Sequence, residues 1–246
     1  MIARTDFLDV QFDPLPFDAA VAWLAARQRD SDYGYVVTPN VDHMVRLADA
    51  PAEVRAAYRQ AALCLCDSRV LAKLARIAGV ALPVVPGSDL TAALFESVLQ
   101  PGDRVALIGG QAEDVARLRL LHPALDILHH EPPMRLRTDA AARAGAARVA
   151  AAAGARFILL AVGSPQQELL AHEIAAIDGA SGTALCIGAS VDFLVGRQIR
   201  APRIVQRAGM EWAWRLATSP RRLARRYLIE GPAIFPLVWR WRRARR

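Results

Sequence analysis

The segment Phe157-Ile-Leu-Leu-Ala-Val-Gly-Ser-Pro-Gln-Gln-Glu168 holds six apolar residues, then a glycine, then a polar stretch that contains a proline. Six apolar residues in a row predict a strand that is buried on both faces of a sheet, over residues 157–162. Gly163 ends this strand. Pro165 opens a helix, because a helix makes no use of the N–H group at its first position. The segment therefore predicts one strand–turn–helix unit of a parallel sheet.

The same order of apolar strand, glycine or polar turn, and helix recurs along the chain. Strands are expected at residues 35–38, 63–66, 104–108, 125–128 and 184–187. Helices are expected at residues 41–50, 52–62, 70–78, 112–121 and 138–153, and another runs to about Leu99 from a cap at Ser88 or Asp89. This repetition predicts an α/β fold, a Rossmann-like parallel sheet with helices on both faces.

Length and composition limit the class of protein. A chain of 246 residues that is 54% hydrophobic and 22% charged can bury a sizeable core, in one large α/β domain or two small ones. Its three cysteines, Cys64, Cys66 and Cys186, are too few for a disulfide scaffold and favour a reducing compartment. The first residues lack the apolar core of a signal peptide. We therefore expect a cytoplasmic protein.

Charge divides the chain near residue 200. Residues 200–246 hold 13 arginines and two acidic residues, a net charge of +11, whereas the whole chain carries +7, so residues 1–199 are about −4. We expect a core over residues 1–199, with a possible further break near residue 101, and a basic helical appendage over residues 200–246. The appendage predicts a polyanionic partner, and a solvated basic tail from an arginine-rich genome is the alternative.

Aromatic residues in the appendage favour a membrane surface as that partner. Trp and Tyr beside Arg suit the bilayer interface, where an amphipathic ring and a cation each find a matching layer. The apolar run at residues 232–239 is far shorter than the roughly 20 residues of a spanning helix, and it contains two prolines. We expect the appendage to lie on the inner face of the membrane and not to cross it.

Candidate ligand-binding residues follow the predicted strands, because ligands of open parallel sheets bind at the carboxyl ends of the strands. Glycine turns at Gly109, Gly163 and Gly188 let backbone N–H groups approach phosphates. Neither the dinucleotide fingerprint nor the lysine motif of ATP-binding loops is present in the sequence. Asp67 directly follows an apolar strand, so its carboxylate can have a raised pKa and take a proton from a hydroxyl. Alternatively, Asp67 or Ser68 caps the following helix.

The sequence favours no metal site. Asp30-Ser31-Asp32 has an Asp-x-Asp form that can hold a divalent ion, but it precedes its strand, at the wrong end of a parallel sheet. His129 and His130 are adjacent on a strand, so their side chains point to opposite faces.

Several of these motifs occur in the order seen in one enzyme family. They are Thr38-Pro-Asn40, Asp67-Ser68, Gly87-Ser-Asp-Leu90, Gly163-Ser-Pro-Gln-Gln-Glu168, Gly188-Ala-Ser-Val-Asp192, Arg200-Ala-Pro-Arg203, Gly209-Met-Glu-Trp212 and Arg225-Arg-Tyr227. Over roughly residues 35–230 the chain resembles the WecG/TagA/CpsF glycosyltransferases, glycosyltransferase family 26. One departure is the stretch Leu82–Pro86, where many members carry an arginine and this chain carries no charge.

The resemblance implies an inverting, metal-independent transferase that needs no cofactor. Such enzymes move a sugar from a UDP-sugar to a polyprenyl-diphosphate-linked saccharide at the cytoplasmic membrane face, in cell-surface polysaccharide or exopolysaccharide biosynthesis. UDP-N-acetylmannosamine, its uronic acid, UDP-glucose and UDP-glucuronic acid all remain open as the donor.

The resemblance also implies roles for individual residues. Asp67 is the expected general base, and Thr38, Asn40 and Gln167 are expected to line the substrate pocket. The positions after the predicted strands add Gly109, Gly163, Gly188 and Asp192 as expected substrate-binding residues. Seven arginines are expected to meet the diphosphate and the membrane: Arg200, Arg203, Arg207, Arg215, Arg221, Arg222 and Arg225.

Two other functions are alternatives to the transferase. One is a nucleic-acid-binding protein that uses the Arg and Trp residues of the appendage. The other is a non-catalytic, membrane-associated partner in a polysaccharide assembly complex. The motifs at the strand ends favour the transferase, and we expect no nucleic-acid partner.

Overall fold

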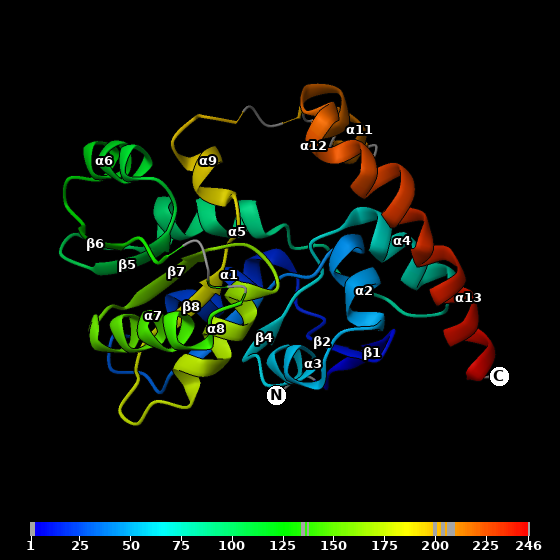
Figure 1. The fold of residues 1–246 in the computed structure, drawn as a ribbon, viewed down its shortest axis with the longest axis horizontal. Coiled ribbons are helices and arrows are strands. Elements are labelled where there is room, and N and C mark those ends of the chain that lie inside the picture. The colour runs from blue at the N-terminus through cyan, green and yellow to red at the C-terminus, as the bar shows by residue number, and fades with distance from the viewer. Residues whose placement is uncertain are drawn as a thin grey trace.

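A computed structural model describes residues 3–133, 136, 138–198, 201–202, 205 and 210–245, and for Arg215 and Arg222 the backbone alone. Six strands form one sheet in the order β4-β3-β8-β7-β5-β6 (Figure 1). The strands are β3 (Gly34–Val37), β4 (Leu63–Cys64), β5 (Arg104–Gly109), β6 (Asp126–His130), β7 (Phe157–Ala161) and β8 (Thr183–Cys186). Every neighbouring pair is parallel, so all six carboxyl ends meet at one edge. The predicted parallel sheet is confirmed.

Helices cover both faces of this sheet, because successive strand residues point to opposite sides. In β7, Ile158 and Leu160 enter one core and Leu159 enters the other. The first core is covered by α2 (Val41–Ala48), α3 (Ala52–Arg59), α4 (Arg69–Ile77), α7 (Ala140–Ala152) and α8 (Gln166–Ala175). The second is covered by α1 (Phe17–Ala25), α5 (Gly87–Ala93) with its π-helical continuation η1 (Leu94–Val98), α6 (Ala112–Leu121) and α9 (Ser190–Leu194).

The N-terminal elements were not predicted from the sequence. A hairpin of β1 (Thr5–Phe7) and β2 (Val10–Phe12) precedes α1. Its turn places Leu8 and Asp9 at φ 54° and 61°, a conformation that Asn and Gly adopt more readily. Strands of three residues give almost no periodic signal, and this turn lacks the usual residues. Phe7 and Phe12 are nevertheless fully buried.

The start of α5 differs from the expectation. Ser88 and Asp89 were expected as its cap, but the helix begins at Gly87, and both residues lie in its first turn. The N–H group of Gly87 donates instead to Oδ1 of Asp67, at 2.7 Å. The prediction of a cap at Ser88 or Asp89 was wrong because the acceptor comes from a residue 20 positions away.

The appendage is helical over residues 211–218 and 220–244. It contains α11 (Glu211–Thr218), α12 (Pro220–Ala224), the π-helical η3 (Arg225–Glu230), the short 3-10 helix η4 (Gly231–Ala233) and α13 (Ile234–Ala244). Pro232 and Pro236 lie in the first turns of η4 and α13, where N–H groups have no partner within the helix. None of the helices in the described ranges is both long enough and apolar enough to cross a bilayer.

The last helix of the appendage packs against the N-terminal hairpin, and both lie at the same side of the molecule (Figure 1). Ile234 and Val238 are buried in the first core. The ring of Trp241 meets that of Phe7 edge-on, with centroids 5.2 Å apart. Burial of each large apolar side chain stabilises a fold by about 1.5–3 kcal/mol. Helix α13 is thus held by the core.

Candidate active site

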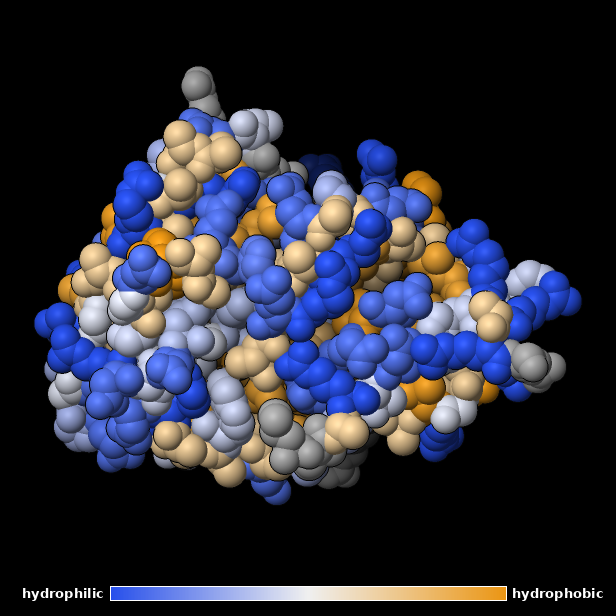
Figure 2. Space-filling model, turned by 90° about the horizontal axis from the view of Figure 1, so that it is seen from below, coloured by the Kyte–Doolittle hydropathy of each residue, from blue (hydrophilic) through white to orange (hydrophobic). Residues whose placement is uncertain are grey.

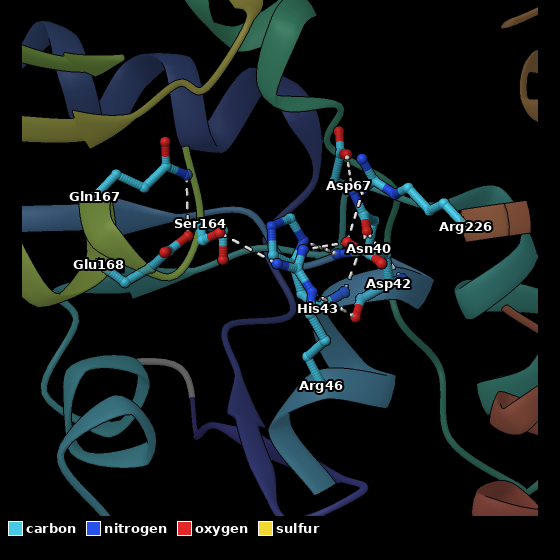
Figure 3. A network of polar contacts seen from close by, with 9 residues as sticks. All are labelled: Asn40, Asp42, His43, Arg46, Asp67, Ser164, Gln167, Glu168 and Arg226. Atoms are coloured by element: carbon cyan, nitrogen blue, oxygen red, sulfur yellow. Dashed lines mark hydrogen bonds and ion pairs between the residues drawn. The ribbon is translucent and has the colours of Figure 1, made fainter. Parts of the chain in front are cut away.

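Asn40 links the first turn of α2 to Asp67. Its Oδ1 accepts hydrogen bonds from the N–H groups of Asp42 at 3.0 Å and His43 at 3.4 Å, which caps the helix. Because the oxygen faces the helix, the amide nitrogen faces away from it, and Nδ2 donates to Oδ2 of Asp67 at 3.4 Å (Figure 3). The cap therefore fixes which atom of Asn40 meets the carboxylate.

The other oxygen of Asp67 is held by the backbone of Gly87. No side chain fits at Gly87, because a Cβ atom there would lie 2.5 Å from Oγ1 of Thr38. Ser68 takes the capping role that the sequence left open, since its Oγ accepts from the N–H group of Leu71 at 3.2 Å. The Asp67 carboxylate is thus oriented by donors from two different elements at the carboxyl edge of the sheet.

His43 lies close to Asp67 but is a poor proton acceptor. Burial, and then the charges of Arg46 and Arg226, lower the pKa of its ring to about 3. Its Nδ1 already accepts from the N–H group of Asn40 at 3.1 Å. His43 is therefore neutral at physiological pH, with the lone pair of Nδ1 in use. The ring of His43 is therefore a weaker candidate for a general base than the carboxylate of Asp67.

Asp67 opens into a cavity of about 410 Å³ that we call the Asp67 cavity. Its floor comes from the core and includes Asn40, Asp42, Asp67, Arg69 and Ser88. Its roof comes from the appendage and includes Glu211, Trp212, Arg226, Tyr227 and Phe235. Core and appendage therefore form this cavity together.

A series of ion pairs and hydrogen bonds begins at Asp42, in the wall of the Asp67 cavity. Nη2 of Arg226 lies 3.0 Å from Oδ2 of Asp42. The same carboxylate pairs with Arg46, one turn along α2. Nη1 of Arg46 donates to the carbonyl oxygen of Ser164 at 3.1 Å (Figure 3). The appendage is thereby linked through α2 to the loop between β7 and α8.

A second cavity of about 690 Å³, the glycine cavity, lies at the carboxyl ends of β5, β7 and β8. The chain leaves β5 toward β6 and leaves β7 toward β8, in opposite directions along the sheet, which makes this the topological switch point where open α/β sheets bind ligands. Gly110, Gly163 and Gly188 line it together with Asp114, Asp192 and Arg197. Nη2 of Arg197 lies 2.5 Å from Oδ1 of Asp114.

Gln167 stands behind the wall of the glycine cavity. Its Oε1 accepts from the N–H group of Gly188 at 2.9 Å, and its Nε2 donates to Oε1 of Glu168 at 2.9 Å (Figure 3). Glu168 is buried, which raises the pKa of its carboxyl. The amide of Gln167 therefore ties the loop after β7 to the loop after β8 and holds the Gly188 turn in place.

The structure places the expected substrate-binding residues in three groups. Asn40 and Asp67 line the Asp67 cavity. Gly163, Gly188 and Asp192 line the glycine cavity. Thr38, Gly109 and Gln167 line neither cavity. Gly109 packs against its neighbour, since a Cβ there would meet Cγ1 of Val162 at 2.8 Å, and Gly110 faces the cavity instead.

The expected arginines are only partly described. Arg200, Arg203 and Arg207 lie outside the described residues, as do the side chains of Arg215 and Arg222. Arg221 and Arg225 are exposed, and Nε of Arg225 lies 3.0 Å from Oε1 of Glu230. Arg226, which the sequence did not single out, lines the Asp67 cavity. Its position three residues after the buried Leu223 is the helical signal that could have separated it from Arg225.

The uncharged stretch Leu82–Pro86 packs beside Cys66, two residues after the end of β4. Val84 forms a parallel bridge with Cys66, and the N–H group of Val85 donates to the carbonyl oxygen of Cys66 at 2.8 Å. Val85 is fully buried in the second core. An arginine at Val85 would bring an unpaired charge into that core.

Metal-ligand residues are scattered over the part of the chain that the structure describes. No group of three or more His, Cys, Asp or Glu side chains there is placed to hold an ion. Asp30 and Asp32 precede β3, at the opposite edge of the sheet from both cavities.

A comparison with family models gives the same family as the motifs. The model described as "Glycosyl transferase WecG/TagA/CpsF family" matches residues 5–246, which include the N-terminal hairpin, both cavities and the whole appendage. Its members are enzymes of cell-surface polysaccharide synthesis that use nucleotide-sugar donors and lipid-linked acceptors. The chain belongs to the WecG/TagA/CpsF family and is a glycosyltransferase.

Proposed function

We propose that this enzyme moves a sugar from a UDP-sugar to a polyprenyl-diphosphate-linked saccharide, with inversion and without a metal ion, in cell-surface polysaccharide or exopolysaccharide biosynthesis. The observation that carries the proposal is the Asp67 carboxylate. It is held by Asn40 and Gly87 in a cavity that the basic appendage roofs.

The glycine cavity suits the donor. Its volume lies within the roughly 300–1,000 Å³ of small-molecule sites, and it occupies the switch point of the sheet. Backbone N–H groups at the Gly110 and Gly163 turns can approach a diphosphate, because glycine carries no side chain there. The N–H group of Gly188 is engaged by Gln167 and holds the shape of the third turn. Asp192 offers oxygens to ribose hydroxyls on another wall of the cavity.

The Asp67 cavity suits the acceptor. In the proposed step, an acceptor hydroxyl attacks the anomeric carbon of the donor, and its proton passes to the Asp67 carboxylate. The bond from the anomeric carbon to the diphosphate oxygen breaks, and its electron pair leaves with UDP. One displacement with one base inverts the configuration. Arg69 and Arg226 line this cavity, and planar guanidinium groups pair with phosphate oxygens.

We further propose that the appendage binds the anionic inner face of the cytoplasmic membrane peripherally. Leu228 of η3 and Phe235 and Trp239 of α13 make up a stripe of apolar residues spaced seven and four positions apart in the sequence, and each is more than half exposed. Phe235 and Trp239 share one face of α13. Exposed arginines surround this stripe at Arg240, Arg242 and Arg243. Hydrophobic and hydrophilic side chains lie intermixed toward the end of the molecule that carries α13 (Figure 2). An amphipathic surface of this composition suits a bilayer interface.

The full chain should release UDP from one of the four candidate UDP-sugars when a short-chain polyprenyl-diphosphate-linked sugar is present. Without the acceptor, release should fall to the hydrolysis background. EDTA should leave the rate unchanged, because arginines and helix N-termini are proposed to stabilise the leaving diphosphate. A coupled assay for UDP measures this. Absence of acceptor-dependent release with every donor, or release that EDTA stops and Mn²⁺ restores, would contradict the proposal.

A further inference from the structure

The two halves of the appendage are anchored differently. Helix α13 places Ile234 and Val238 in the first core, and Trp241 packs against it. The roof segment, residues 211–230, covers the Asp67 cavity, and among its described side chains Leu223 alone is buried. Segments with few buried apolar side chains open more readily than the core to which they are attached. Polar contacts therefore contribute a larger part of the free energy that holds the roof segment closed than of the free energy that holds α13.

Asp42 supplies such a contact from the core. Its side chain is 11% exposed, and its Oδ2 lies 3.0 Å from Nη2 of Arg226 in the roof segment. Arg46 pairs with the same carboxylate and also bonds the loop at Ser164, so Asp42 is held on its core side. By contrast, Arg225 pairs with Glu230 of its own segment, a contact that does not reach the core. Arg226 therefore links the roof segment to the core, whereas Arg225 links two residues within the roof segment.

Arg226 keeps unused donors in this arrangement. A guanidinium carries five N–H donors, and Asp42 engages one nitrogen. Nε of Arg226 is buried and has no partner among the described residues. A buried N–H group without an acceptor is unfavourable. Nε itself is enclosed, but Arg226 lines the Asp67 cavity, where its other N–H groups can donate to an anion. A diphosphate has the geometry that a guanidinium binds best.

We propose that Asp42 is a positioning residue that fixes Arg226, and with it the roof segment, over Asp67. Asp42 does not contact the reacting atoms. It holds one edge of the guanidinium so that the remaining donors face the acceptor's diphosphate. This inference rests on the proposed function for the identity of that anion. The closure of the roof by Asp42 can be measured without any substrate.

Amide hydrogen exchange of the full chain without ligands tests the closure. The variants are Asp42→Asn, which keeps the size of the side chain, Arg226→Gln, and the double variant. Each single variant should raise exchange in residues 211–230 by about fivefold or more, and the double variant should raise it no further, since both remove one contact. Exchange in the sheet and in α13 should stay as in the wild type. Asp49→Asn removes an equal charge at the exposed end of α2 and should change nothing.

Kinetics separate positioning from a general structural role. Asp42→Asn should raise the KM for the lipid-linked acceptor about tenfold and change kcat by less than about threefold, because Asp67 keeps its own donors. Unchanged exchange in residues 211–230, additive effects in the double variant, or loosening of the sheet as well would overturn the proposal. So would a fall in kcat at constant KM. If the wild type released UDP from none of the tested UDP-sugars, the proposed function would fail. Hydrogen exchange in residues 211–230 would still decide whether Asp42 holds the roof segment closed.

Discussion

Asp67→Asn is expected to lower kcat for transfer by about 10²–10⁴-fold, the usual contribution of a general base, while donor binding stays close to that of the wild type. The amide has nearly the same size, and its oxygen can still accept from the N–H group of Gly87. It cannot take the acceptor's proton at neutral pH. Donor binding should persist because the proposed donor site is the glycine cavity, which Asp67 does not line. Steady-state kinetics and calorimetric titration with the UDP-sugar measure the two effects.

A second carboxylate in the same cavity provides the matched control. Glu211 lines the Asp67 cavity from the roof, and Glu211→Gln makes the same change of charge there. We expect Glu211→Gln to keep kcat within about tenfold of the wild type, because among the residues that the structure describes no donors like those of Asn40 and Gly87 orient Glu211. A large loss of kcat in Glu211→Gln together with a near-normal kcat in Asp67→Asn would show that Glu211, and not Asp67, is the general base.

Leu228→Asp combined with Trp239→Asp is expected to weaken binding to anionic vesicles about 100-fold. Leu228 is 58% exposed and Trp239 56% exposed, so each still has much apolar surface to bury in a bilayer. Loss of roughly 1–2 kcal/mol for each side chain gives a combined effect of this order. The new carboxylates would also face the anionic lipid headgroups. Vesicle sedimentation over a range of lipid concentrations measures the change.

The control for this prediction is a second exposed apolar pair. Leu120 and Leu121 of α6 are 81% and 52% exposed, and α6 lies on the opposite side of the molecule from α13 (Figure 1). Leu120→Asp with Leu121→Asp adds the same charge and removes a similar apolar area, and it should leave vesicle binding unchanged. Equal weakening in both double variants would show that net charge, and not the stripe of Leu228, Phe235 and Trp239, governs binding.

The sheet could be predicted because its strands are signalled locally. The apolar run at residues 157–162 needs a fully buried strand, and β7 occupies residues 157–161 of it. The position of Asp67 at a cavity could be predicted for a related reason, since the end of a parallel strand lies at the edge of the sheet where ligands bind. By contrast, β1 and β2 are stable through contacts with distant elements, such as Trp241 on Phe7, which leave no local pattern.

Side-chain direction was harder to predict than position. Gln167 follows β7 as predicted and lies in the first turn of α8, but both ends of its amide are engaged behind the cavity wall, by Gly188 and Glu168. Arg225 and Arg226 are adjacent in sequence but point in different directions from the π-helical η3, so one faces solvent and the other faces Asp42. Which of them faces the core depends on how the appendage docks, and the docking surface includes the unpredicted hairpin.

The anomeric configuration of the product tests the central claim most directly. The claim is that Asp67 serves as the base for a single displacement at the sugar of a UDP-sugar. Transfer by the full chain to a short-chain lipid-linked acceptor, followed by NMR measurement of the coupling at the new linkage, should show a configuration opposite to that of the donor. Retention of the donor's configuration would require two displacements or a different path, and would contradict the role assigned to Asp67.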